Sequence, residues 1–406
     1  MSAMPPSPRI PFDWEERRQW LELPMPVAEF EGRVARLQAA MGRDGFDALV
    51  VYGGLNDPHN VRYLSNFKPW WGDAIVIVPS SGEPILLTNS IFHGEPMHSN
   101  VQTIWLKDLR VTPHPHSTAE PKNVADMAAD ALKERGVAPG TVGLVGHQTI
   151  PAYLDRQLAQ RLAAATPKPA THLLKSMRKN KSAEEVRMLR EAARIAEQGF
   201  MAALNAVRPG ITESELAGLA GGACLAAGAE DLNYGIMCSA GSRSCLKNVF
   251  PTRKPLREGE LFVIDVGIKY HGYQTDISRN KVVGEPDPLV RRMLDCCLEQ
   301  HLKVIEAIGP GVPIFELQKI MYGVAERWGL LEYDYTTVAF GHGYGLDIVE
   351  EPYLYWGNTQ PLEIGMTFYV EPMIIKHGLG TVCLEDMVVV TENGCEQMTG
   401  VMRKTW

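Results

Sequence analysis

The spacing of apolar residues divides the first part of the chain into alternating helical and extended segments. Apolar side chains recur every three or four residues from Val27 to Met41, which predicts an amphipathic helix. A second helix is expected at 124–135, and short apolar runs typical of strands occupy residues 47–52, 74–78, 84–88 and 142–145. Helices that alternate with strands over about 165 residues predict an α/β domain.

The pattern changes near residue 170, where a Pro-rich segment, 166–170, interrupts the alternation. Beyond it, Ser182 and Glu185 form the signature of a capping box that starts a helix, and Thr212 and Glu215 start the next one. Apolar strands are expected afterwards, at 261–267, 367–372 and 387–390. We therefore expect an α/β N-terminal domain at 1–170, with a Pro-rich arm at about 1–26, and an α+β C-terminal domain at 171–406.

The composition is that of a globular protein, since 45% of the 406 residues are hydrophobic and 22% are charged. An excess of acids, 48 Asp and Glu against 40 Lys and Arg, gives a formal net charge of −8, which argues against a nucleic-acid partner. No apolar run approaches the roughly 20 residues that span a bilayer, so no membrane partner is expected. The seven cysteines lack CxxC spacing and the N-terminus has no signal-peptide pattern, so the expected location is cytoplasmic.

Five polar residues of the second domain stand at the ends of apolar strands or in Gly-rich turns. Asp265 follows four apolar residues, in a strand where an uncompensated carboxylate would cost of the order of several kcal/mol. Segments 257–265 and 362–371 resemble each other, which suggests two related halves that present acids to a shared centre. An oxygen-rich set with one imidazole suits two divalent cations such as Mn, Fe, Co or Zn. Its members are Asp265, Asp276, His342, Glu371 and Glu385.

The order of these residues resembles that of the M24 family, the pita-bread metallohydrolases that include aminopeptidase P, prolidase and creatinase. Residues 56–67 are similar to the creatinase-type N-terminal domain, so the resemblance covers nearly the whole chain. It implies a creatinase-like N-terminal domain, a pita-bread catalytic domain and a dinuclear centre with the five residues as ligands. It further implies that Asp276 and Glu385 bridge the metals and that Glu371, the catalytic residue, moves a proton. The resemblance also implies a homodimer whose N-terminal domain contributes to the partner's site.

Four positions depart from the peptidase pattern of that family. Asn248, Val338 and Val349 stand where its peptidases carry histidines, and Cys383 stands where they carry an arginine. Because such side chains orient a peptide and donate protons, their replacement favours a compact, partly apolar substrate. The candidate substrate contacts are therefore these four residues, Tyr344 beside the expected ligand histidine, and the aromatic pair Trp70 and Trp71.

The preferred hypothesis is a dinuclear metal-dependent hydrolase that cleaves a C–N (amide-like) bond of a small non-standard substrate with a metal-bound hydroxide. The alternatives are an Xaa-Pro dipeptidase or aminopeptidase P, a metal-dependent lyase on a small metabolite, and a non-catalytic pseudoenzyme that binds a partner. Four buried carboxylates without a cation would repel one another, which argues against the last alternative.

Overall fold

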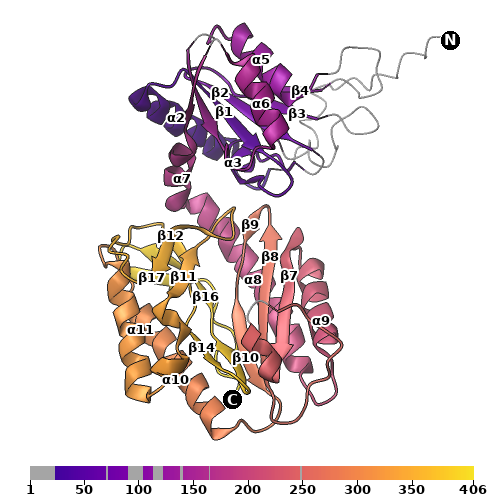
Figure 1. Cartoon of the computed structure of the whole chain (residues 1–406), viewed down its shortest axis with the longest axis vertical. Helices are drawn as coiled ribbons and strands as arrows, with labels where there is room; N and C mark the ends of the chain where they lie inside the picture. Colours follow the sequence, from indigo (N-terminus) through magenta and orange to yellow (C-terminus); the bar gives the residue numbers. More distant parts are fainter. Residues whose placement is uncertain are drawn as a thin grey trace, which may run out of the picture. The chain divides into compact units, whose positions relative to one another are not determined.

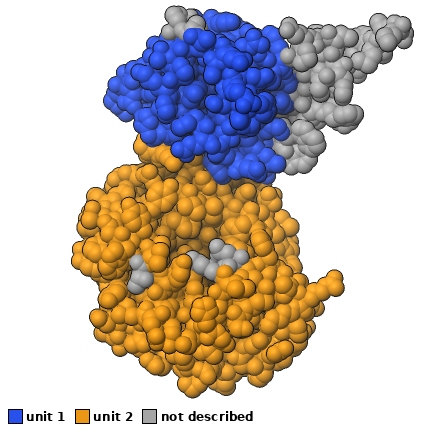
Figure 2. All heavy atoms as spheres, in the orientation of Figure 1, with its two compact units in different colours: residues 1–174 blue, residues 175–406 orange. Residues whose placement is uncertain are grey.

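The structure is a computed structural model that describes residues 23–69, 72–89, 104–112, 122–137, 140–163, 165–246 and 249–406. It divides into two compact units, residues 1–174 and 175–406, which Figure 2 distinguishes by colour. The first 22 residues of the expected Pro-rich arm lie outside the described residues, as do Trp70, Trp71 and Asn248. Within the described ranges, no helix combines the length and the apolar composition needed to cross a bilayer.

The first unit is built on a mixed six-stranded sheet with the strand order β4-β3-β2-β1-β5-β6 (Figure 1). The central strand β1 pairs antiparallel with β2 and parallel with β5. The strands are β1 (Ala48–Gly53), β2 (Ala74–Pro79), β3 (Ile85–Thr88), β4 (Asp108–Val111), β5 (Thr141–Val145) and β6 (Thr166–Pro169). The helices are α2 (Val27–Asp44), α3 (His59–Ser65), α5 (Val124–Glu134) and α6 (Ala152–Arg161), and α7 (Thr171–Lys179) continues into the second unit.

The local sequence explains why most helices and strands of this unit form where they do. Helix α2 buries the expected apolar stripe, which includes Phe30 and Leu37, and it ends at Gly45 with φ 73°, a left-handed conformation that glycine adopts without strain. All residues of β1 and β2 are buried, as expected for strands covered on both faces. One expectation was wrong: the Pro-rich segment near 166–170 is not a simple break, because it forms the exposed edge strand β6 beside β5. Proline is tolerated there because an edge strand leaves backbone positions that need no ladder donor.

The second unit contains two larger sheets, and a pair of helices packs on each of them (Figure 1). In the first sheet the strand order is β10-β8-β7, with β9 also paired to β8. Its strands are β7 (Asp231–Ala240), β8 (Leu261–Tyr270), β9 (Tyr273–Gln274) and β10 (Ser278–Val282), and its helices are α8 (Ala183–Ala206) and α9 (Glu213–Ala226). Both predicted capping boxes are confirmed, at Ser182 with Glu185 and at Thr212 with Glu215.

The second large sheet has the order β12-β11-β13-β16-β17, and β14 and β15 form a separate two-stranded sheet. A cluster that includes Leu317, Phe340 and Phe368 joins the large sheet to its helices. Its strands are β11 (Ala339–Gly343), β12 (Glu350–Tyr355), β13 (Thr367–Val370), β16 (Asp386–Thr391) and β17 (Gly394–Gln397). The remaining elements are α10 (Pro288–Ala307), α11 (Ile314–Trp328), β14 (Met373–Lys376), β15 (Gly380–Cys383) and the 3-10 helices η2 (Gly241–Leu246), η3 (Leu331–Tyr333) and η4 (Tyr335–Thr337).

Helices α10 and α11 interrupt the part of the chain for which only strands were expected. A local signal for α10 is present, because Asp287 caps the helix by accepting a hydrogen bond from the backbone N–H of Leu289 and proline occupies its first position. The second unit is therefore built from two helix pairs and the sheets that they cover, with an α+β composition.

Candidate metal centre

Asp265 faces away from the helices that cover its sheet. It lies within β8, where it pairs with Ser278 of β10 and Met237 of β7. Its neighbours Ile264 and Val266 are completely buried. Because successive side chains of a strand point to opposite faces, these two apolar residues pack in the core while Asp265 points to the other face.

His342 reaches the same region from the second large sheet. Gly341 has φ 147°, and a Cβ at that position would collide with the carbonyl oxygen of Tyr369. Only glycine therefore allows β11 to lie this close to the backbone of β13. The Nδ1 atom of His342 lies 3.2 Å from the carbonyl oxygen of Gly343. With the ring proton assigned to Nδ1 for this hydrogen bond, Nε2 is left as the free donor atom for a cation.

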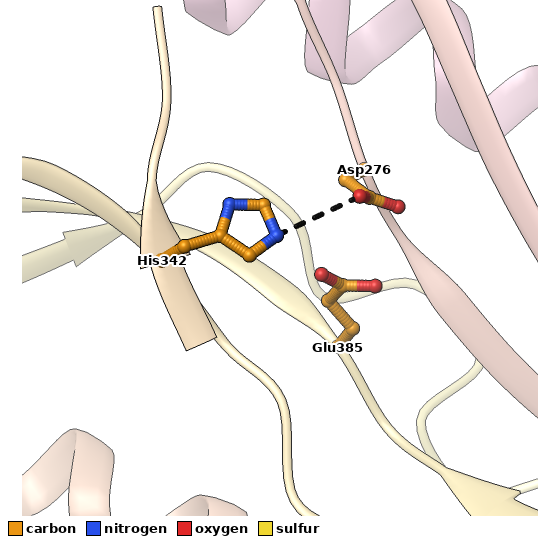
Figure 3. A group of neighbouring side chains, drawn as sticks. All are labelled: Asp276, His342 and Glu385. Atoms are coloured by element: carbon orange, nitrogen blue, oxygen red, sulfur yellow. Dashed lines mark ion pairs between the residues drawn. The ribbon is translucent and has the colours of Figure 1, made fainter. Parts of the chain in front are cut away.

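Asp276, His342 and Glu385 point toward one another from three separate segments of the chain (Figure 3). One candidate ligand atom from each lies within 4.8 Å of the other two, and Nε2 of His342 is 3.9 Å from Oδ2 of Asp276. Glu385 is 1% exposed, and its Oε2 accepts a hydrogen bond of 3.2 Å from the hydroxyl of Ser278. No donor among the described residues reaches its buried Oε1. A buried carboxylate oxygen without a donor fits a cation site.

Asp265 and Glu371 adjoin this group. Together with Cys383, they line a cavity of about 40 Å³. Glu371 follows β13 directly, and its backbone N–H donates to the carbonyl oxygen of Phe340 at 2.9 Å. The thiol sulfur of Cys383 is 3.9 Å from Oε1 of Glu371. The hydroxyl of Tyr234 contacts Oδ1 of both Asp265 and Asp276, which the sequence gave no reason to expect.

The charges of the cluster are mutually unfavourable in the absence of a cation. Burial, followed by the neighbouring carboxylates, raises the pKa of Asp265 and Glu385 well above their usual range, and burial raises the pKa of Asp276 from 3.8 to about 6. A hydroxyl has one proton, so Tyr234 can donate to only one of its two carboxylate neighbours at a time. Oxygen ligands plus one imidazole nitrogen form a donor set that divalent cations of the Mn, Fe, Co and Zn type accept. The residues present therefore fit a metal centre.

A buried ion-pair network supports the backbone behind Glu385. Arg279 is completely buried, and its guanidinium donates to the carbonyl oxygens of Ser278 and Glu385 at 2.9 and 2.7 Å. It also pairs with Asp386 at 2.5 Å. Burial alone would raise the pKa of Asp386, but Arg279, His301 and Arg403 outweigh burial and hold that pKa well below its usual range. Sequence reasoning missed this network, because Arg279 and Asp386 belong to different strands, β10 and β16, that lie far apart in the sequence.

The expected substrate contacts divide into exposed and buried groups. Val338 and Val349 are 60% and 46% exposed. Cys383 is buried, and so is Tyr344, whose ring stacks on Tyr369 and whose hydroxyl donates to the carbonyl oxygen of Val388 at 3.2 Å. Tyr344 thus supports the Gly-rich turn in this structure instead of facing an open cavity.

Tyr353 is a further residue beside the centre that the sequence did not single out. It is the direct partner of His342 in the antiparallel pairing of β11 and β12, and it is 39% exposed. Directly paired residues on antiparallel strands present their side chains on the same face. Tyr353 and Val349 also line one pocket, whose other lining residues are charged: Lys175, Arg178, Lys179, Asp347, Glu350 and Glu351.

Comparisons with known proteins agree with this architecture. Residues 187–392, about half of the chain, match the model of metallopeptidase family M24, and residues 33–179 match that of the creatinase/prolidase N-terminal domain. An Xaa-Pro dipeptidase of Pyrococcus furiosus is 33% identical over 232 residues, which are 57% of this chain and 66% of that protein. An Xaa-Pro dipeptidase of Pyrococcus horikoshii is 26% identical over 372 residues, which are 92% of this chain and 98% of that protein.

A solved structure has the same fold. The crystal structure of the prolidase from Pyrococcus horikoshii matches with a TM-score of 0.79 and 24% identity, over 92% of this chain and 100% of that one. The expected pairing of a creatinase-like N-terminal domain with a pita-bread catalytic domain is thereby confirmed. The chain belongs to metallopeptidase family M24 and is a metal-dependent hydrolase that acts on C–N bonds.

Proposed function

We propose that this hydrolase cleaves a C–N (amide-like) bond in a small substrate other than a standard Xaa-Pro peptide. The observation that carries this proposal is the pair of exposed aliphatic side chains, Val338 and Val349, which stand four residues before and seven residues after His342 in the sequence. Neither can donate a proton or hold a peptide carboxylate, whereas a histidine at the same position could do both. Tyr353 and Val349 line one pocket whose remaining lining residues are charged, which favours a small polar substrate that also carries an aliphatic or aromatic group.

We assign five residues as the ligands of two divalent cations: Asp265, Asp276, His342, Glu371 and Glu385. Such cations, when bound, lower the pKa of a water molecule and polarise the carbonyl group that it attacks. Burial and the mutual repulsion of the carboxylates support this assignment, as does the Glu385 oxygen that no donor reaches. Glu371 borders the cavity beside Asp265, a position suited to taking a proton from the attacking water and passing it to the leaving nitrogen.

A substrate panel tests the proposal. The protein, reconstituted with Mn²⁺ or Co²⁺, is assayed on Xaa-Pro dipeptides and on small N-acyl compounds with aliphatic or aromatic groups. We expect kcat/KM on every Xaa-Pro dipeptide to stay below about 10⁴ M⁻¹s⁻¹, the lower end for enzymes on their own substrates. A higher value on any of them would overturn the proposal.

A histidine substitution gives the panel an internal control. Val349→His introduces an imidazole into the pocket that Val349 lines, so it should raise kcat/KM on Xaa-Pro dipeptides relative to the unmodified protein. Val27→His is the matched control, because Val27 is 41% exposed and belongs to helix α2 of the first unit. Equal behaviour of both variants would contradict the role given to Val349.

The second candidate function is that of an Xaa-Pro dipeptidase. It is favoured by the Pyrococcus horikoshii relative, which carries that name and aligns over 92% of this chain. This function requires that other side chains replace the histidines absent at 338 and 349. Rapid cleavage of Xaa-Pro dipeptides in the panel would select it.

We further propose that the protein forms a homodimer in which the N-terminal domain contributes Trp70 or Trp71 to the partner's site. The family resemblance of the N-terminal domain supports this proposal. Light scattering of the purified protein should give twice the 45.0 kDa chain mass. A measured mass equal to that of one chain at all concentrations would refute the homodimer.

A further inference from the structure

Tyr234 enters the region of the carboxylates from an irregularity in β7. The pairing of β7 with β8 runs from Leu232, opposite Ile268, directly to Ile236, opposite Val266. Three residues of β7 therefore stand opposite the single residue Gly267. Such bulges re-aim a side chain and are frequent next to active sites. Within the bulge Gly235 has φ 86°, which any other residue would adopt only with strain.

Strand β8 is shaped to receive the ring of Tyr234. A Cβ added at Gly267 would lie 2.6 Å from two ring atoms of Tyr234 and 2.9 Å from its hydroxyl oxygen. Gly267 is two residues from Asp265, so both lie on the same face of β8. The missing side chain at Gly267 is what allows the ring to cross β8 beside Asp265.

The hydroxyl of Tyr234 links two separate segments of the chain. It contacts Oδ1 of Asp265, within β8, and Oδ1 of Asp276, which lies between β9 and β10. A phenol hydroxyl has an ordinary pKa of about 10, so at neutral pH it carries a proton that it can donate.

We propose that Tyr234 is a positioning residue of the metal centre, which holds the carboxylates of Asp265 and Asp276 in the arrangement that a divalent cation binds. This inference rests on the ligand set of the proposed function. Without the hydroxyl, the two like-charged groups are free to rotate apart, and cation binding must then bring them together again. Loss of such supporting partners typically lowers metal affinity about 10-fold to 100-fold.

Two variants remove this support in different ways. Tyr234→Phe deletes the hydroxyl and keeps the ring, while Gly267→Ala keeps the hydroxyl and displaces the ring. Tyr273→Phe is the matched control, because the buried hydroxyl of Tyr273 also donates to a buried carboxylate, Oε1 of Glu185, at 3.1 Å. That carboxylate belongs to a helix cap and not to the candidate centre.

The assay measures cation binding directly. Each full-length protein is stripped with a chelator, checked for a cooperative thermal transition, and titrated with Co²⁺ alone by calorimetry and by visible absorption, which reports the coordination geometry. We expect Tyr234→Phe and Gly267→Ala to bind at least one Co²⁺ about 10-fold to 100-fold more weakly, with a changed spectrum. Tyr273→Phe should bind like the unmodified protein.

The outcomes separate this inference from the function on which it rests. If the unmodified protein binds Co²⁺ and both Tyr234→Phe and Gly267→Ala match it within about twofold, the positioning role is refuted and the ligand set stands. An equal loss of affinity in Tyr273→Phe also refutes it. If the unmodified protein binds no Co²⁺, the ligand assignment itself fails.

Discussion

Removal of the cations should destabilise the protein in a way that depends on pH. The perturbation is exhaustive chelation, and the quantity compared is the melting temperature of the metal-loaded and the chelated protein between pH 5 and pH 7.5. Burial raises the pKa of Asp276 from 3.8 to about 6 in the folded protein without cations. Asp265 and Glu385 shift in the same direction, because burial and the other carboxylates oppose their ionisation.

The sign follows from the raised pKa. A carboxyl that is harder to ionise in the folded state stabilises the fold below its unfolded pKa, and this stabilisation is lost as the pH rises through the folded value. For Asp276 the change from 3.8 to about 6 corresponds to about 3 kcal/mol, lost between about pH 4 and pH 7. Bound cations compensate the ionised carboxylates, so the loaded protein does not suffer this loss.

The two melting curves should therefore separate as the pH rises. About half of that loss, roughly 1.4 kcal/mol, falls between pH 5 and pH 7.5. At about 2–4 °C per kcal/mol for a unit of this size, the loss at Asp276 alone therefore widens the gap between the melting temperatures by roughly 3–6 °C over that range. Groups outside the centre, such as Asp386 with its lowered pKa, affect both samples equally. Asp276→Asn is the control, because it removes this titrating group together with one proposed ligand, so the gap should widen less with pH than in the unmodified protein. A gap of the same size at pH 5 and pH 7.5 would refute the reasoning.

Two further predictions concern the supporting structure. Arg279→Met should lower the free energy of unfolding, measured with urea, by about 3–5 kcal/mol, because it leaves Asp386 buried without its main partner. The control is Arg194→Met, at an exposed pair with Glu191, which should lower the free energy of unfolding by less than about 1 kcal/mol. Equal losses in the two variants would contradict the prediction. Gly341→Ala should reduce the amount of bound Co²⁺, because the added methyl group displaces the strand that carries His342. Gly357→Ala is the control, since φ is also positive there but no atom lies within 4 Å of an added Cβ, and it should bind Co²⁺ normally. Unchanged binding in Gly341→Ala would contradict the prediction.

Elements governed by neighbouring residues were predictable from the sequence. The helix expected from Val27 to Met41 is α2, and the long helix expected after Ser182 is α8, each with the buried stripe that its spacing indicated. The strands expected at 74–78 and 84–88 correspond to β2 and β3. Caps and apolar periodicity act within a few residues, so they can be identified without the fold.

Elements that depend on distant partners were not predictable in the same way. The Pro-rich segment after Ala165 becomes the edge strand β6 only because β5 lies beside it. Arg279 gives no sign in the sequence that Asp386, 107 residues away, is its partner. Tyr234 lies 31 residues before Asp265 and 42 before Asp276, and its place beside them depends on the bulge in β7 and on the space left by Gly267.

The two-domain architecture and the family were predictable from the sequence, because the apolar patterning, the caps and the order of five polar residues can all be read along the chain. How those residues meet depends on the packing of the strands. One candidate ligand atom from each of Asp276, His342 and Glu385 lies within 4.8 Å of the other two. Tyr344 is buried in the core, while Val338 and Val349 are exposed. The physical reason is that burial, like-charge repulsion and close approach of backbones depend on which strands pack together, and that arrangement is a property of the whole fold.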